Sequence, residues 1–181
     1  MVELLSTKLF IPRPRSDRVS RPRLIERLNA GLDRKITLIA APAGFGKTTL
    51  LSEWIPRSPR PVAWFSLDEG DNSPAHFWAY VIAALQTLSP ELGKGAQPLL
   101  RSLPTPAIKS ILTGLLNEVH TFEQPFVFIF DDYHLIENTE IDDELAYLID
   151  HQPPNLHLFI TTRIDPGLPL SRLRARNQLV E

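Results

Sequence analysis

One stretch, residues 38 to 51, limits what this chain can fold into more than any other. It reads LIAAPAGFGKTTLL, an apolar run followed by small residues, a Gly-Phe-Gly-Lys turn and two threonines. From Ala41 to Thr48 it fits the phosphate-binding pattern GXXXXGK[ST], with alanine in place of the first glycine. The apolar run has the length of a strand and the segment after the loop favours a helix. The stretch therefore predicts a strand, a loop and a helix that together bind an anion.

The residues of this loop have separate expected roles. We expect Gly44 and Gly46 to let backbone N–H groups turn inward around phosphate oxygens, while the helix that begins near Lys47 adds its dipole. Lys47 would neutralise the outer phosphates, and the hydroxyl of Thr48 would ligate Mg²⁺. The alternative is a glycine-rich turn with an exposed lysine, which the agreement of strand, helix and Lys-Thr pair disfavours. The predicted phosphate-binding residues are Pro42, Ala43, Gly44, Phe45, Gly46, Lys47, Thr48 and Thr49.

Two carboxylates follow another apolar run, in FVFIFDDYH. Asp131 and Asp132 would stand at the carboxyl end of a strand, the edge where a phosphate loop lies in parallel sheets. A bound triphosphate brings a cation, so we predict that Asp131 holds Mg²⁺ through water. We predict Asp132 as the general base that orients attacking water. Two solvated turn residues are the alternative. Asp132 is one methylene shorter than the usual glutamate, which argues against fast hydrolysis.

Three further polar positions fall near the same predicted edge. Arg163 follows the last apolar run, FITTRIDP, and we predict that it contacts a γ-phosphate, with a surface salt bridge as the alternative. In the acidic segment SLDEGDN, Asp68 or Glu69 could position water or cap the following helix, and both interpretations stay open. We interpret His134 as a packed or hydrogen-bonded residue, because the five histidines show no metal-ligand spacing.

The order of apolar runs and helical patterns predicts an α/β fold. Four strands are expected, at 35–41, 61–67, 125–132 and 155–163. Helices are expected at 21–32, 46–55, 74–88, from Thr105 to about His120, and at 139–150, with an irregular, proline-rich connection over 89–106. Ser73 and Thr139 are expected helix caps, and the first twenty residues are expected to be extended. Strands that are apolar throughout and alternate with helices favour a three-layer structure with a parallel sheet.

The composition excludes several classes of protein. A 43% share of hydrophobic residues and a net charge of -2 indicate a globular chain and disfavour a polybasic nucleic-acid binder. The chain has no cysteine, which rules out disulfides and thiolate metal sites. No apolar run has the length of a signal-peptide core or of a membrane span. We therefore expect a cytoplasmic chain of one domain without membrane contact, with an extended segment and helix at 1–34 and the sheet core at 35–181.

The motifs taken together resemble a known family. Its segments occur here in order as TKLFIPRPR, RPRLIERL, APAGFGKTTLLSEW, WFSLDEGDN, AYVIAALQ, FIFDDYHLI, HQPPNLHLFITTR and LRARNQLVE. They are similar to the nucleotide-binding module of the STAND class of signalling ATPases, specifically the MalT-like branch of the large LuxR-type transcriptional activators. The phosphate loop is generic to many proteins, whereas SLDEGDN with DDYHLI is far more particular to this branch.

The resemblance implies a fold, a ligand and a mode of action. The fold would be a P-loop NTPase of the ASCE/STAND type, the ligand ATP or ADP with Mg²⁺, and slow hydrolysis would reset a switch. Val19, Ser20 and Arg21 would lie near the adenine. The family adds winged-helix, sensor and helix-turn-helix domains that are not in this sequence. The chain is therefore expected to stop at the opening of its fifth strand, without the last strand or strands, and to work with downstream domains of a longer parent protein.

Three functions remain open at this point. The main hypothesis is an ATP/ADP-binding signalling switch of a transcriptional regulator, which self-associates when activated. A turnover ATPase or a P-loop kinase on the same fold is one alternative, and a non-catalytic interaction module is another. Direct DNA binding by this segment is disfavoured because the sequence shows neither a helix-turn-helix nor an excess of basic charge.

Overall fold

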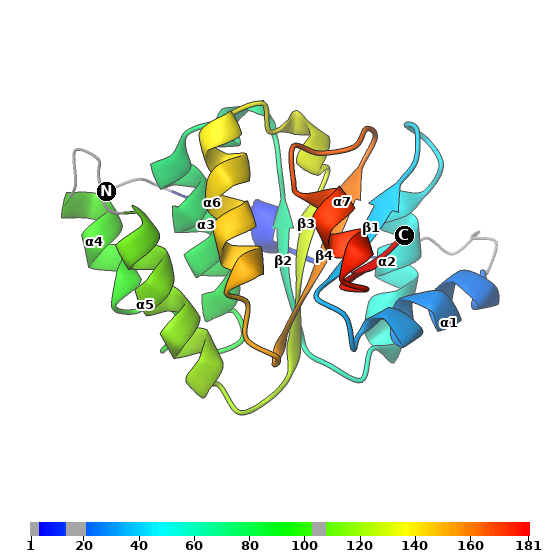
Figure 1. Cartoon of the computed structure of the whole chain (residues 1–181), viewed down its shortest axis with the longest axis horizontal. Helices are drawn as coiled ribbons and strands as arrows, with labels where there is room; N and C mark the ends of the chain where they lie inside the picture. Colours follow the sequence, from blue (N-terminus) through cyan, green and yellow to red (C-terminus); the bar gives the residue numbers. More distant parts are fainter. Residues whose placement is uncertain (1–3, 14–20, 103–107) are drawn as a thin grey trace.

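A five-stranded parallel sheet lies at the centre of the computed structural model, which describes residues 4–13, 21–102 and 108–181 (Figure 1). Its strands lie in the spatial order β2-β3-β4-β1-β5. Every neighbouring pair is parallel, as the apolar runs predict. The four long strands lie within the predicted ranges. The bounds are Ile36–Ala40 for β1, Val62–Ser66 for β2, Phe126–Asp131 for β3, Leu156–Thr162 for β4 and Leu179–Val180 for β5.

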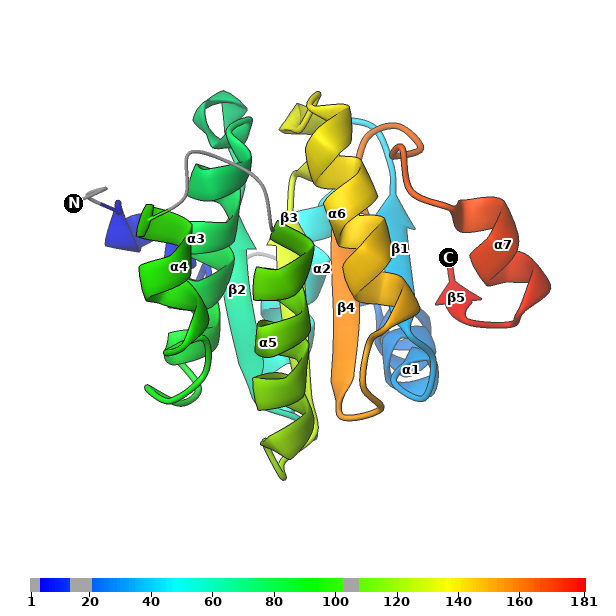
Figure 2. The ribbon, with the colours of Figure 1, turned by 60° about the vertical axis from the view of Figure 1, so that its left-hand side comes forward.

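Helices cover both faces of the sheet, so the predicted three layers are confirmed (Figures 1 and 2). Helices α3 to α6 pack on one face, and α1 and α2 pack on the other. No helix in the described part of the chain is long and apolar enough to cross a membrane. The bounds are Pro22–Gly31 for α1, Lys47–Trp54 for α2, Pro74–Gln86 for α3, Ala96–Ser102 for α4, Ile108–Thr121 for α5, Thr139–Asp150 for α6 and Leu170–Ala175 for α7.

Strand β3 shows why the strands are apolar throughout. Side chains alternate between the two faces of a strand, and both faces are covered here. Phe126, Phe128 and Phe130 enter the larger core under α3, α5 and α6. Val127 and Ile129 enter the smaller core under α1 and α2. Strand β3 therefore carries an apolar residue at every position from Phe126 to Phe130.

The connection after α3 differs from the expectation of an irregular segment over 89–106. Helix α4, Ala96–Ser102, forms inside it. Pro98 is the third residue of this helix, in the first turn, where the backbone N–H has no intrahelical partner and proline is tolerated. The prediction of an irregular segment was wrong at α4 for that reason. The predicted helix start at Thr105 lies outside the described residues.

The two predicted helix caps had different outcomes. Ser73 is the N-cap residue of α3 and Pro74 occupies the first helical turn, both as expected, but the side chain of Ser73 makes no capping hydrogen bond. At α6 the capping residue is Asn138, whose side chain accepts a hydrogen bond of 2.9 Å from the backbone N–H of Glu140. Thr139 is instead the first residue of the helix. The asparagine satisfies one of the unpaired N–H groups of the first turn, so the threonine is not needed there.

The two ends of the described chain lie at opposite edges of the sheet. Residues Ser6–Leu9 form a turn of 3-10 helix beside β2, so the expectation of an extended N-terminal segment was wrong for these residues. Strand β5 pairs with Ile36 and Thr37 of β1 and with no later residue of that strand. A fifth strand therefore opens here, as expected, and covers the first part of β1.

Candidate functional site

The glycine-rich loop connects the end of β1 to the start of α2. Gly44 has a φ of 82° and Gly46 a φ of 76°, in the left-handed region that favours glycine. Gly46 is also the N-cap of α2 and offers no side chain to the helix. The first N–H groups of α2 therefore lie free of side-chain partners among the described residues, which suits an anion at this helix end.

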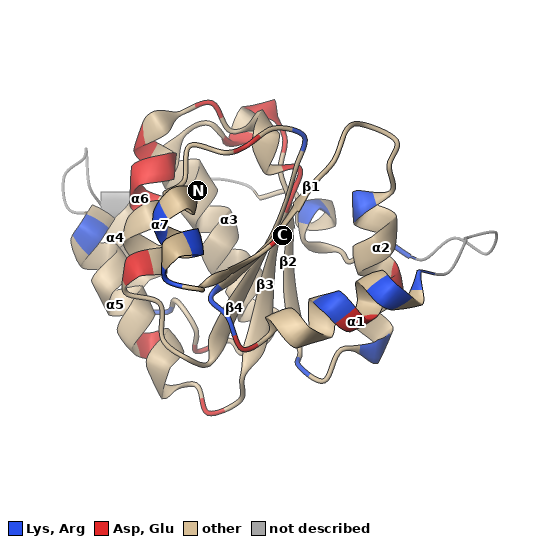
Figure 3. Ribbon diagram, turned by 45° about the vertical axis from the view of Figure 1, so that its right-hand side comes forward, with Lys and Arg blue, Asp and Glu red and all other residues tan. Residues whose placement is uncertain are grey.

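Lys47 lies inside the loop and not on its surface. Its side chain is buried, with 8% of the residue exposed. The Nζ donates hydrogen bonds to the carbonyl oxygens of Ala41 at 2.8 Å and of Pro42 at 3.4 Å. Figure 3 shows this basic start of α2 beside the end of β1, across the sheet from the acidic residues of α6. An exposed lysine in an ordinary turn, the alternative interpretation, does not match this burial.

A chain of hydrogen bonds joins the loop to the ends of β3 and β4. Asp131 is buried, with 4% exposed, and its carboxylate accepts from the hydroxyl of Thr48 at 2.9 and 3.1 Å. The hydroxyl of Thr161 donates to Asp131 Oδ1 at 2.6 Å and accepts from the backbone N–H of Asp132 at 2.8 Å. Thr161 had no predicted role of its own. Its position at the end of a strand beside the carboxylates was the only signal in the sequence.

The pairing of Thr48 with Asp131 provides a test of whether Mg²⁺ fits. Burial raises the pKa of Asp131, while the hydrogen bonds from Thr161 and Thr48 oppose the shift. A buried carboxylate beside a hydroxyl offers the hard oxygen ligands that Mg²⁺ prefers. Among the described residues no group of three or more His, Cys, Asp or Glu side chains could hold a metal ion. These two residues fit the cation, and its other ligands would have to come from nucleotide oxygens and water.

Asp132 and Arg163 lie at the same end of the sheet but in different surroundings. Asp132 adopts a left-handed conformation, with a φ of 61° and a ψ of 42°, which aspartate tolerates better than most residues. Its side chain is 37% exposed, and its Oδ1 lies 3.8 Å from Nδ1 of His134. Arg163 follows β4, is exposed, and makes no salt bridge within the described part of the chain. The surface salt bridge considered for Arg163 is therefore not observed.

Arg21 lies against the loop from the side of α1. Its Nη1 donates a 3.1 Å hydrogen bond to the carbonyl oxygen of Phe45. A Cβ placed on Gly46 would lie 3.4 Å from Arg21 Nη2, so the guanidinium crosses directly over this glycine. The structure thus places Arg21 beside the predicted phosphate loop. Val19 and Ser20 lie outside the described residues.

A cavity of about 290 Å³ adjoins the loop between α1 and β1. Mostly apolar side chains form its walls, among them Leu24, Leu28, Leu38, Ala40, Phe45 and Val180. The charged residues of the lining are Arg21, Arg27, Lys47 and Glu181. An apolar cavity whose lining includes cationic side chains has the chemistry to take an aromatic base joined to phosphates.

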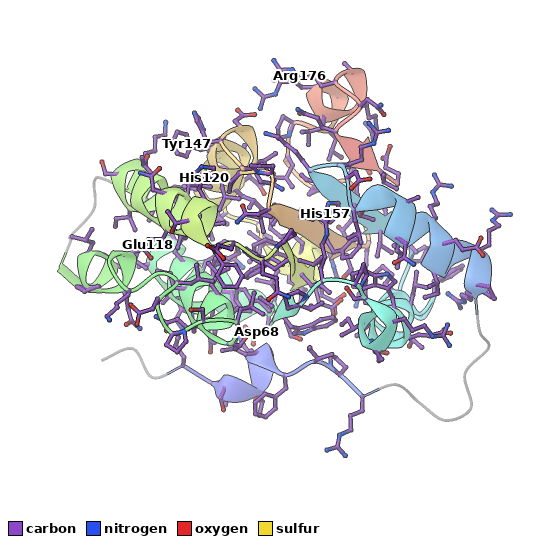
Figure 4. The ribbon with its side chains drawn as sticks, turned by 90° about the horizontal axis from the view of Figure 1, so that it is seen from below. Asp68, Glu118, His120, Tyr147, His157 and Arg176 are labelled. Atoms are coloured by element: carbon purple, nitrogen blue, oxygen red, sulfur yellow. The ribbon has the colours of Figure 1, made fainter. Side chains whose placement is uncertain are left out.

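The acidic segment after β2 has a structural role. Asp68 accepts from the N–H of Gly70 at 2.9 Å, and Asp71 accepts from the N–H of Asp68 at 2.8 Å, so the two carboxylates cap a 3-10 turn. Lys8 binds both carboxylates, at 2.7 Å and 2.8 Å, and lowers the pKa of Asp68. Figure 4 shows Asp68 beside the N-terminal 3-10 turn that carries Lys8. Asp68 therefore caps the 3-10 turn Glu69–Asp71 and not helix α3, which was the helix it was expected to cap. Sequence reasoning missed Lys8.

Asn72 ties this segment to the loop that follows β3. Its Oδ1 accepts from the backbone N–H of Glu137 at 2.7 Å and of Asn138 at 3.1 Å. Its Nδ2 donates to the carbonyl oxygen of Leu135 at 2.9 Å. The loop that carries Asp132 is therefore held at both ends, by Thr161 on the sheet and by Asn72 beyond it.

The comparisons with curated proteins identify relatives over nearly the whole chain, although no protein-family model matches it. The transcriptional regulator MalT of Klebsiella pneumoniae is 35% identical over 178 residues, which is 98% of this chain. MalT of Serratia proteamaculans is 36% identical over the same length. The chain is similar to one segment of MalT over nearly its whole length. It spans 20% of the length of each of these MalT proteins.

Solved structures support the fold. A STAND-class signal transduction ATPase with a tetratricopeptide-repeat sensor from Pyrococcus horikoshii aligns with a TM-score of 0.58 and 19% identity, over 86% of this chain and 22% of its own. Cdc6p of Pyrobaculum aerophilum aligns with a TM-score of 0.55 and 14% identity, over 94% of this chain and 46% of its own. The chain therefore has the α/β fold of these ATPases, as the sequence motifs predicted.

Proposed function

We propose that the chain is the nucleotide-binding module of a MalT-type regulator and that it binds ATP or ADP together with Mg²⁺. One observation carries the proposal. The loop that holds Lys47 brings Thr48 within 2.9 Å of the buried carboxylate of Asp131, and no described cation neutralises that carboxylate by a salt bridge. The Mg²⁺ that accompanies a nucleotide phosphate would supply the missing positive charge. The apolar cavity beside Arg21 would then receive the base.

The proposed roles of the remaining residues follow from their positions. Residues 42–49 would surround the phosphates with backbone N–H groups, and Lys47 would turn its ammonium from loop carbonyls to phosphate oxygens. Thr48 and Asp131 would hold the Mg²⁺, which neutralises phosphate charge when bound. Arg163 would contact the γ-phosphate from the end of β4. Its exposure, and the lack of a salt bridge to any described residue, leave the guanidinium available for that contact.

Hydrolysis in this proposal is slow and resets a switch. The oxygen of a water molecule forms a bond to the γ-phosphorus, and the bond to the bridging oxygen of the leaving ADP breaks. The water gives a proton to the carboxylate of Asp132. A γ-phosphate that Arg163 contacts would make the ATP and ADP states differ, and a two-state switch needs such differential contacts.

We also propose the wider setting of the module. The described residues would form part of one domain of a cytoplasmic regulator, and downstream domains would respond to the bound nucleotide and promote self-association. Direct DNA binding is not proposed for this segment, since the net charge is -2 and Glu26 interrupts the arginines of α1. No observation favours a kinase or a turnover ATPase over the switch. A non-catalytic interaction module would not need the pairing of Thr48 with Asp131.

Calorimetric titration with ATP and Mg²⁺ tests the proposal on Lys47→Ala. Removing a charge that contacts phosphate should cost about 3 kcal/mol, or roughly a 100-fold weaker affinity. The matched control is Lys94→Ala, which removes an exposed lysine whose ion pair, within the part of the chain that the structure describes, is with Glu91 on the loop after α3. Near-ultraviolet circular dichroism would check that both variants keep the fold. Equal ATP affinity in the two variants would contradict the role of Lys47.

A further inference from the structure

A second cavity, of about 390 Å³, lies at the amino ends of the strands, away from the phosphate loop. Its lining comes from the segments that precede β1, β2, β4 and β5. Because the strands are parallel, these segments share one edge of the sheet, opposite the edge that carries the phosphate loop. The sequence segments HQPPN and RNQ both contribute to the lining. The proposed nucleotide site gives these two segments no role.

Cationic side chains outnumber carboxylates in this lining. Arg34, Lys35 and Arg60 line the cavity together with one carboxylate, that of Asp33. The side chain of Asp33 is 93% exposed, and its Oδ1 lies 3.5 Å from Nη2 of Arg60. Neither Arg34 nor Lys35 forms a salt bridge with any residue that the structure describes. The cavity therefore carries positive charge that its own carboxylate only partly neutralises.

Hydrogen bonds to backbone carbonyl oxygens hold each of the three cations in place. Arg60 Nη1 donates to Leu32 at 2.9 Å, Arg34 Nη1 to Asn177 at 2.9 Å, and Lys35 Nζ to Ile149 at 2.7 Å. A guanidinium has five N–H donors and an ammonium has three, so each cation keeps donors for a ligand. Side chains that are already fixed also lose little freedom when an anion binds.

The surroundings of Lys35 show the excess of positive charge. Burial lowers the pKa of Lys35, Asp150 opposes the shift, and the charges of Arg176 and Arg172 add to it. Both arginines belong to the basic segment in and after α7, shown blue in Figure 3, and Figure 4 labels Arg176. An anion in the cavity would relieve the repulsion among these cations.

Gln152 adds a buried polar group to the lining. The residue is 8% exposed, and its Nε2 donates to the carbonyl oxygens of Lys35 at 3.0 Å and of Leu156 at 2.7 Å. Its Oε1 has no hydrogen-bond partner among the described residues. Buried polar atoms are nearly always paired, so this oxygen calls for a donor. A bare anion cannot supply a donor, whereas a hydroxyl group can.

We propose that this cavity binds a small phosphomonoester that carries a hydroxyl group. Its phosphate would contact Arg34, Lys35 and Arg60, and its hydroxyl would donate to Oε1 of Gln152. A phosphate offers three oxygens and about two negative charges to cations that come from different segments, whereas a carboxylate offers two oxygens and one charge. The cavity volume lies near the lower end of the range of about 300 to 1,000 Å³ for small-molecule sites, which suits a small ligand.

Titration followed by backbone-amide NMR tests the site on the whole chain carrying Lys47→Ala. That background removes the expected phosphate contact of the loop, so the remaining binding reports the second cavity. The probes are glycerol 3-phosphate, inorganic phosphate and glycerol, at an ionic strength held constant with potassium chloride. We expect saturable shifts at residues 32–35, 152 and 177–178. Glycerol 3-phosphate should bind about 3- to 10-fold more tightly than inorganic phosphate, which lacks the added hydrogen bond, and glycerol should not bind.

Two variants of the lining, made in the same background, identify the residues that hold the phosphate. Arg34→Gln and Arg60→Gln should each weaken binding of glycerol 3-phosphate about 10- to 100-fold, because each removes a charged hydrogen-bond donor. Arg57→Gln is the matched control, since that side chain is 54% exposed and pairs with Glu53. Near-ultraviolet circular dichroism would check the fold. If Arg60→Gln does not fold, Arg34→Gln decides, because Arg34 is exposed.

The inference is overturned if glycerol 3-phosphate causes no saturable shifts around the cavity in the Lys47→Ala chain. It is also overturned if Arg34→Gln binds the ester as tightly as Arg57→Gln does. Equal affinity for inorganic phosphate and for the ester would refute the contact with Gln152 and the choice of a phosphomonoester. The site lies at the other edge of the sheet, so a failure of ATP to bind at the loop would leave this test unaffected.

Discussion

Replacing Thr161 with valine tests the hydrogen-bond chain that organises the site. The hydroxyl of Thr161 is fully buried, donates to the carboxylate of Asp131 and accepts from the N–H of Asp132. Valine has almost the same shape, so the change leaves no cavity. Its effect should therefore come from the two lost hydrogen bonds alone.

The size of the effect follows from these two bonds. A hydrogen bond to a charged group contributes about 1.5 to 3 kcal/mol, and a buried donor left unpaired costs about 1 to 3 kcal/mol. In the valine variant Thr48 still donates a hydrogen bond to Asp131, and water can reach part of Asp132. We therefore take the lower half of the range obtained by adding these two contributions. We expect Thr161→Val to lower the free energy of unfolding by about 2.5 to 4 kcal/mol at pH 7.

Urea unfolding of Thr161→Val beside Thr161→Ser gives the measurement. Serine keeps the hydroxyl and should retain most of the stability. The hydrogen bond from Thr161 holds the pKa of Asp131 down, so the valine variant should raise that pKa further. Its stability deficit should therefore shrink as pH falls and Asp131 becomes protonated. A valine variant within about 0.5 kcal/mol of the wild type, in the range of an ordinary surface change, would refute this account of the site.

Two further predictions concern buried titratable groups away from the site. The carboxyl group of Glu144 accepts a hydrogen bond from the indole N–H of Trp78, and burial raises its pKa to about 6. The stability that this raised pKa contributes is therefore full below about pH 4.5 and is lost as the pH rises through 6. In urea unfolding, Glu144→Gln should be more stable than the wild type by up to about 2 kcal/mol above pH 7 and equally stable near pH 4. Equal stability of the two proteins at both pH values would contradict this prediction. The ring of His157 hydrogen-bonds to the hydroxyl of Thr37 and to the carbonyl oxygen of Arg34, and burial lowers its pKa to about 4. The stability that this neutral ring contributes is therefore full above about pH 6.5 and is lost as the pH falls towards 4. The advantage of the wild type over His157→Asn should shrink by up to about 3 kcal/mol between pH 7 and pH 4, and a constant difference would count against a buried neutral ring.

Much of the fold could be predicted because local signals and global packing agree. Successive residues of β3 enter the two cores in alternation, so five consecutive positions must be apolar. Such an apolar run can be recognised in the sequence without a structure. The loop with Gly44 and Gly46 needs left-handed backbone, which glycine supplies at low cost. The carboxyl ends of parallel strands share one edge, so the proximity of Asp131 to the loop followed from topology alone.

The rest depended on contacts between distant residues. Helix α4 was missed because Pro98 disfavours a helix unless it falls in the first turn. Lys8 binds Asp71, which lies 63 positions away in the sequence, and no local sequence pattern predicts that pairing. His134 lies in a loop that Asn72, from a distant segment, holds by a hydrogen bond to the carbonyl oxygen of Leu135. A helix or strand has a period that can be recognised in sequence, whereas a single side-chain contact between loops has none.

Titration calorimetry of the unmodified chain with ATP and with ADP, each with Mg²⁺ and after its removal with EDTA, tests the central claim most directly. The account predicts saturable binding of both nucleotides, with ATP bound more tightly when Mg²⁺ is present because Thr48 and Asp131 hold the cation. Acid extraction beforehand would show whether nucleotide had copurified with the chain. An empty chain that gives no binding heat at millimolar nucleotide would contradict the account.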